Sequence, residues 1–135
     1  MTISESVEQL LGSKVRVTEQ FYSLLFSRHP ELKVLFARSD MRMQATMLTM
    51  ALASVESYYS HHFPATEHYF QVLGHRHFHA GVRRDDFIKF EITLLDVLRE
   101  FHQQDWSADL EAEWRDATRK AVSKMEEGYT QTFTY

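Results

Sequence analysis

Three histidines alternate with other residues in the stretch Leu73-Gly74-His75-Arg76-His77-Phe78-His79-Ala80-Gly81-Val82. On a β-strand the three imidazoles would share one face and suit a metal ion such as zinc. On an α-helix, residues two apart point about 200° apart around the axis, so the three side chains diverge. The helix is favoured by an apolar stripe at helical spacing, formed by Tyr69, Phe70, Leu73, His77 and Ala80. His77 is the one histidine in that stripe, and we expect His75 and His79 to be more exposed.

The residues alone leave the role of His77 open. A histidine in an apolar stripe is more often a core residue with a satisfied hydrogen bond than a metal ligand, and a zinc site of three histidines would need a strand. The methionines of residues 41–50 also have two open interpretations, because methionine fills irregular gaps in a core and equally borders a flat apolar ligand. The other histidines are expected at solvated surface positions: His29, His61, His62, His68 and His102.

Helical spacing recurs on both sides of this stretch, and no strand-like alternation of useful length appears. We expect a first helix capped by Thr2 and Glu5, further helices over 13–28, 38–59 and 64–80, and a short one over 30–36. A helix capped by Asp85 or Asp86 should run to 101, and Ser107 should cap the last one. The predicted inner faces are Val17, Phe21, Leu24 and Leu25; Met43, Met47, Leu48, Met50, Leu52 and Val55; Phe87, Phe90, Leu94, Leu98 and Phe101; and Leu110, Trp114, Ala117, Ala121 and Met125.

Composition agrees with an all-α fold of six to seven helices in a single domain over residues 1–135. The chain has only 4 Gly and 2 Pro, which favours long helices over many short strands. A net charge of −4 and the lack of a long basic run disfavour nucleic acid as a partner. No apolar run approaches the roughly 20 residues of a membrane span. The first residues lack the basic and apolar regions of a signal peptide, so we expect a cytoplasmic protein without membrane association.

Four segments, taken in order, resemble bacterial single-domain haemoglobins and the globin domain of flavohaemoglobins over nearly the whole chain. They are Phe21-Tyr22-Ser23-Leu24-Leu25-Phe26, Pro30 to Phe36, Asp40-Met41-Arg42-Met43-Gln44 followed by Leu48, and Leu73-Gly74-xx-His77-xxx-Gly81-Val82. Trp114 stands in the last helix where such haemoglobins often carry a tryptophan. The resemblance implies a globin fold around a haem pocket.

The resemblance also implies roles for individual residues. His77 would bind the haem iron, oriented by a backbone carbonyl of the preceding turn near Leu73. Relatives often carry lysine at the position of Met47, so one partner of a haem propionate is lost or replaced by Arg76. The other implied haem contacts are Phe36 on the haem face, Tyr22, Gln44 and Leu48 on the side opposite His77, and Val82 and Phe87 at the haem edge.

The implied cofactor is haem b, and the implied ligands are oxygen, nitric oxide and carbon monoxide. The Tyr22 hydroxyl and the Gln44 amide can both donate hydrogen bonds to a partly charged gas, which predicts tight oxygen binding. Flavohaemoglobins carry a tyrosine where this chain has Phe87, which argues against efficient catalysis. The alternatives are a gas sensor domain, an enzyme (nitric oxide dioxygenase, nitrite reductase or peroxidase-like) that needs an external reductase, and an all-α interaction protein without a cofactor.

Overall fold

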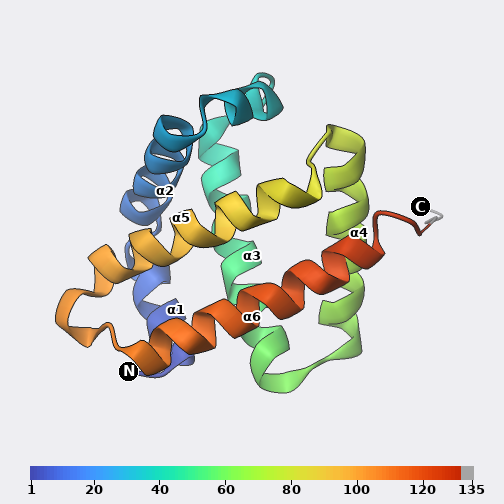
Figure 1. Ribbon diagram of the computed structural model, residues 1–135. Coiled ribbons are helices and arrows are strands. Elements are labelled where there is room, and N and C mark those ends of the chain that lie inside the picture. Colours follow the sequence, from blue (N-terminus) through green and yellow to red (C-terminus); the bar gives the residue numbers. More distant parts are fainter. Residues whose placement is uncertain (132–135) are drawn as a thin grey trace.

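The computed structural model describes residues 1–131 of the chain (Figure 1). All of its elements are helical, which confirms the all-α prediction. Six are α-helices and two are short 3₁₀ helices: α1 (Ile3–Gly12), α2 (Lys14–Arg28), η1 (Pro30–Phe36), α3 (Met41–His61), α4 (Pro64–Ala80), α5 (Arg84–His102), η2 (Gln103–Asp105) and α6 (Ala108–Glu127).

The two C-terminal helices α5 and α6 run side by side across the other helices (Figure 1). Helix α6 packs against α3 and α4, while α5 packs against α2. These crossings enclose the core, because the inner faces of α5 and α6 carry large apolar side chains. The bulkiest apolar residues with almost no exposed surface are Phe21, Phe70, Leu94, Leu98, Leu110 and Trp114.

Several predicted helix ends are confirmed by their capping contacts. The Thr2 hydroxyl accepts from the Glu5 amide, and the Glu5 carboxylate accepts from the Thr2 amide. The Ser107 hydroxyl accepts from the Leu110 amide at 3.0 Å. Gly81 ends α4 at a φ of 95°, a left-handed conformation that costs a glycine little because it has no Cβ. This turn redirects the chain directly after the histidine stretch.

Two predicted helix starts are wrong. Helix α3 begins at Met41 rather than at residue 38, because the Asp40 side chain accepts from the Arg42 amide and so starts the helix there. Helix α5 begins at Arg84, before both acidic residues that were expected to cap it. Asp86 instead lies one turn inside, where its carboxylate accepts from the Arg83 amide at 2.9 Å.

On α2, α3 and α5, some of the residues predicted to face the core are exposed or only partly buried. Met43, Met47 and Met50 keep 59%, 47% and 61% of their surface exposed, whereas the neighbouring Leu48, Leu52 and Val55 are buried. The methionines lie on one flank of α3, so the core uses only part of its apolar surface. Phe90 and Phe101 of α5, and Leu24 of α2, are likewise only partly buried.

The expectation of a surface position for His102 is also wrong. His102 is 5% exposed, and its Nε2 lies 2.6 Å from the hydroxyl oxygen of Ser6 in α1. The same hydroxyl oxygen accepts from Trp114 Nε1 of α6 at 3.0 Å. The His102 ring is stacked on Trp106, with the two planes only 6° apart. These contacts join α1, α5 and α6 in one buried polar cluster, which local sequence patterns do not reveal.

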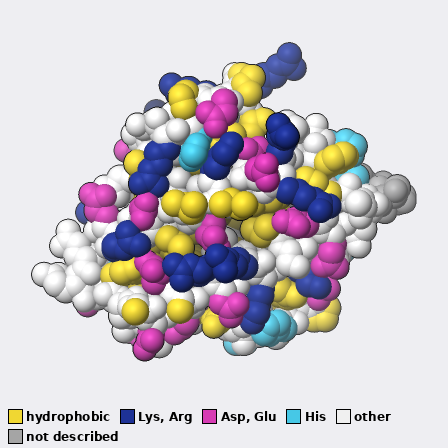
Figure 2. All heavy atoms as spheres, in the orientation of Figure 1, with side chains coloured by type: hydrophobic (Ala, Val, Ile, Leu, Met, Phe, Trp, Pro, Cys, Tyr) yellow, Lys and Arg dark blue, Asp and Glu magenta, His cyan; other side chains and the backbone are white. Residues whose placement is uncertain are grey.

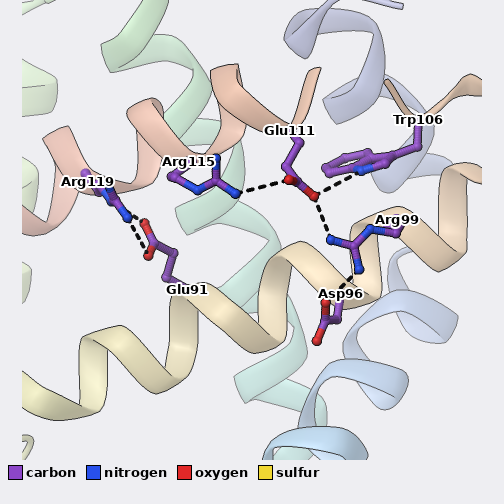
Figure 3. A network of polar contacts seen from close by, with 7 residues as sticks. All are labelled: Glu91, Asp96, Arg99, Trp106, Glu111, Arg115 and Arg119. Carbon is purple, nitrogen blue, oxygen red and sulfur yellow. Dashed lines mark hydrogen bonds and ion pairs between the residues drawn. The ribbon is translucent and has the colours of Figure 1, made fainter. Parts of the chain in front are cut away.

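Charged pairs connect α5 and α6 on the outside of the fold (Figure 3). Arg119 pairs with Glu91, and Glu111 accepts from both Arg99 and Arg115. On the face that shows these two helices, side chains of both charges lie between apolar ones (Figure 2). Over residues 1–131, no helix has both the length and the apolar character that crossing a membrane requires.

Helices α4 and α6 approach closely where Gly74 faces Met125. A Cβ on Gly74 would overlap the backbone carbonyl of Met125, so a residue with a side chain would push the two helices apart. The contact fixes the position of α4 relative to α6 at this point. It therefore positions the following residues of α4, which include the three histidines.

Candidate functional site

His77 lies in the last turn of α4 and is half-buried. Its Nδ1 is 2.8 Å from the carbonyl oxygen of Leu73, which confirms the predicted acceptor. A carbonyl only accepts, so Nδ1 carries the proton, and the neutral ring leaves a lone pair on Nε2. Burial lowers the pKa of His77, an effect that the bond to Leu73 partly opposes, so the surroundings favour the neutral ring. In this tautomer Nε2 has the lone pair that binding a metal ion requires.

Aromatic rings surround His77 on the side of α5. The Phe87 ring is stacked near the imidazole, with 6.4 Å between the ring centroids. Phe87 also contacts Tyr129, at a centroid distance of 5.9 Å. Tyr129 also donates its hydroxyl to the carbonyl of Val82 at 2.8 Å, which holds the chain just after Gly81 in place. Burial and two nearby carboxylates raise the pKa of Tyr129 to about 12, so this hydroxyl stays protonated.

A second polar contact joins α2 to α3. Gln44 Nε2 donates to the Tyr22 hydroxyl oxygen at 3.1 Å. Because Gln44 already supplies this donor, the proton of Tyr22 is free to point toward another acceptor. Burial raises the pKa of Tyr22 to about 12, although the bond from Gln44 opposes the shift. The Tyr22–Gln44 pair therefore offers a protonated hydroxyl at all physiological pH values.

Aromatic packing fixes the Tyr22–Gln44 pair. The Tyr22 ring meets Phe36 of η1 edge-on at 5.4 Å and stacks near Phe26 at 5.9 Å. Its neighbour Phe21 meets Phe90 of α5 at 5.1 Å. Leu48, one turn after Gln44, is buried. Residues predicted from three separate segments of the sequence thus form one cluster.

Helix η1 links this cluster to the histidine helix. A Cβ on Gly81, which directly follows α4, would lie 3.7 Å from the Leu35 side chain. Leu35 precedes Phe36, the residue that contacts Tyr22, so η1 lies between the two groups of predicted residues. Leu73, Val82 and Phe36 are all partly buried against the core.

Two predicted site residues lie at the surface. Met47 is 47% exposed, and Arg76 is exposed on α4. Arg76 lies close enough to Tyr69 to lower the pKa of that phenol, although burial raises it by more. The helical form of α4 also removes the three-histidine zinc arrangement. Among residues 1–131, no group of three or more His, Cys, Asp or Glu side chains is placed to hold a metal ion.

Tyr129 lies beside the candidate site, although the sequence pattern did not predict it there. It follows the end of α6, outside the predicted helix, so it was not counted with the inner face. A signal was present, because Ala121, Met125 and Tyr129 repeat at a spacing of four residues. Residue His75 departs from expectation as well, since it is half-buried while His79 is exposed.

Comparisons with known proteins agree on the architecture. The family model named Globin matches residues 19–125. The fold is similar to the crystal structure of a protein from Pseudomonas aeruginosa PAO1 that is described as structurally highly homologous to a human hemoglobin. That similarity has a TM-score of 0.79 at 20% sequence identity, and it covers 96% of this chain and 100% of the other. No curated protein matches the sequence significantly.

Proposed function

The chain belongs to the globin family, and we propose on that premise that it binds one haem group through His77 and a diatomic gas at the haem iron. The observation that carries the proposal is the 2.8 Å contact between His77 Nδ1 and the Leu73 carbonyl oxygen. It orients the ring, selects the tautomer with a free Nε2 lone pair, and is the kind of outer contact that iron-binding histidines use.

The residues around His77 fit a haem group. The lowered pKa of His77 favours the neutral imidazole, which is the form that binds a metal ion. Leu73, Val82 and Phe87 give this region an apolar character, which suits a flat aromatic macrocycle. The sequence has no cysteine, so the thioether attachment of c-type haem is impossible and haem b is the fitting form.

The Tyr22–Gln44 pair supports a role on the gas side. Haem iron supplies the coordination position that the gas occupies. The Tyr22 hydroxyl is protonated, buried and already bonded by Gln44 on its acceptor side, so it donates to a partly negative ligand such as bound oxygen. The second hydrogen of the Gln44 amide remains for the same purpose. Phe36 packs edge-on against the Tyr22 ring, and Leu48 is buried one turn after Gln44.

At the haem periphery, Arg76 suits a propionate carboxylate because its guanidinium is exposed on the helix that carries His77. Met47 offers a thioether on the exposed flank of α3, which would give the haem apolar contact but no charge. Val82 and Phe87 complete the edge. Oxygen, nitric oxide and carbon monoxide are the ligands that we expect.

The surroundings of His77 favour gas binding over peroxidase-like turnover. Its Nδ1 bonds a neutral carbonyl rather than a carboxylate, and the adjacent ring is Phe87, which has no hydroxyl. A carboxylate partner would make the imidazole a stronger electron donor to the iron. We therefore propose reversible ligand binding as the main function.

A haemin titration tests the proposal. The purified chain should take up one equivalent and develop a strong haem absorption band, which shifts when the reduced protein is exposed to carbon monoxide. A chain that stays colourless with added haemin, or a band with no response to carbon monoxide, would contradict it.

A further inference from the structure

Two histidines of the original stretch, His75 and His79, have no part in the proposed haem site. They are four residues apart on α4, so both side chains lie on the same face of the helix. Their ring centroids are 4.5 Å apart and the ring planes are inclined at 71°. Since His77 lies two residues from each, its side chain points to the other side of α4.

Two imidazoles at this spacing have a chemical use. Helical metal sites employ histidines four residues apart on one face because both nitrogens then reach a single ion. Imidazole nitrogen suits zinc, copper and nickel, and a zinc–nitrogen bond is about 2.0–2.1 Å long. Small rotations of two rings whose centroids are 4.5 Å apart bring their nitrogens within that reach. We propose that His75 and His79 form a binding site for one divalent transition-metal ion.

The position of the pair on α4 supports such a site. His79 is exposed, whereas His75 is half-buried with its Nδ1 shielded from solvent, so an ion would approach the pair from the side of His79. The main chain before His75 is fixed, because Gly74 packs against the backbone of Met125. His79 belongs to the last turn of α4, where the partial negative charge of a helix C-terminus attracts a cation. Within residues 1–131 no third metal-binding side chain joins the pair, so water completes the coordination shell.

Metal binding would affect the part of α4 that carries His77. An ion held by residues 75 and 79 links two successive turns of the helix and opposes fraying at Ala80 and Gly81. The folded chain gains stability because the unfolded chain does not hold the two imidazoles together. This site uses neither His77 nor the Tyr22–Gln44 pair, so it stands independently of the haem proposal.

The inference is tested by calorimetric titration. Haemin is first added to the untagged chain, which is then titrated with copper, nickel or zinc chloride alone. We expect one ion per chain, tightest for copper, since divalent affinities peak at Cu²⁺. The variant His79→Ala should weaken binding at least about tenfold, because even the loss of an outer partner costs roughly 10–100-fold in metal affinity. The exposed His61 of α3 provides the matched control, and His61→Ala should bind like the parent chain.

A second variant and the thermal midpoint give independent tests of the metal site. His75→Ala should weaken binding as His79→Ala does, and if the half-buried position prevents folding, the exposed His79 variant still decides. The thermal midpoint of the parent should rise with added metal, while that of His79→Ala should not. Unchanged affinity in His79→Ala, an equal loss in His61→Ala, or no binding by the parent would each overturn the site.

Discussion

Replacing Tyr22 with Phe removes one hydroxyl from a buried position and leaves the ring in place. Tyr22 is 7% exposed, and its aromatic contacts with Phe36 and Phe26 do not involve the oxygen. The substitution therefore tests the hydrogen bond to the gas more than the packing. A hydrogen bond to a charged group is worth about 1.5–3 kcal/mol. At 1.4 kcal/mol per factor of ten, Tyr22→Phe should speed oxygen dissociation roughly 10- to 100-fold.

The contact between Gln44 and Tyr22 predicts that a change at Gln44 also alters oxygen dissociation. Gln44→Leu should speed oxygen dissociation at least roughly two- to tenfold, because it removes a neutral bond of about 0.5–1.5 kcal/mol to the tyrosine oxygen and also the second amide hydrogen proposed to face the gas. In the double variant, the two effects should combine to less than their product, since part of the Gln44 effect acts through the absent hydroxyl.

Rapid mixing of the oxygenated protein with carbon monoxide gives the oxygen dissociation rate. It is measured for the parent chain, the two single variants and the double variant. Tyr58→Phe is the matched control, because Tyr58 is also buried and lies farther along α3. An unchanged rate in Tyr22→Phe, or an equal effect in Tyr58→Phe, would refute the assignment of Tyr22 to the gas. Fully multiplicative single effects would refute the coupling through Gln44.

Three further predictions concern the fold and are checked by urea unfolding. Gly74→Ala should destabilise the chain by about 1–3 kcal/mol through overpacking, whereas Gly12→Ala, with open space at its Cβ, should not; equal effects would contradict the close helix contact. Burial lowers the pKa of His102, so the unfolded chain binds more protons and stability should fall as the pH drops below about 6.5. The variant His102→Asn should weaken this dependence of stability on pH, and an unchanged slope would show that His102 is not its source. Tyr129→Phe should cost about 0.5–1.5 kcal/mol through the lost bond to the Val82 carbonyl, and unaltered stability would show that the bond is unimportant.

Short-range patterns in the sequence account for much of the fold. The capping residues Thr2 and Ser107, the stop at Gly81 and the inner face of α6 are local features, and the structure has each of them. The choice of His77 over its neighbours followed from helical geometry in the same way. Such features need only the residues within a few turns of one another.

The errors arise where distant segments decide. His102 is buried because Ser6, from the other end of the chain, contacts it in the core and also accepts a hydrogen bond from Trp114. The methionines of α3 are apolar but lie on an exposed flank, because burial depends on which neighbour covers a face. Tyr129 contacts Val82 across 47 positions of sequence. Local patterns did not predict that Tyr22, Phe36 and Gln44 lie together. That prediction came only from the resemblance to known haemoglobins.

The central claim is that His77 is the protein ligand of the haem iron, and imidazole rescue tests it most directly. His77→Gly should bind haemin weakly and lose the resonance Raman band of the bond between ferrous iron and histidine. Added imidazole should enter the space left by the side chain and restore that band together with the absorption spectrum of the parent. If His77→Gly keeps the iron–histidine band without imidazole, another residue holds the iron and His77 is not its ligand.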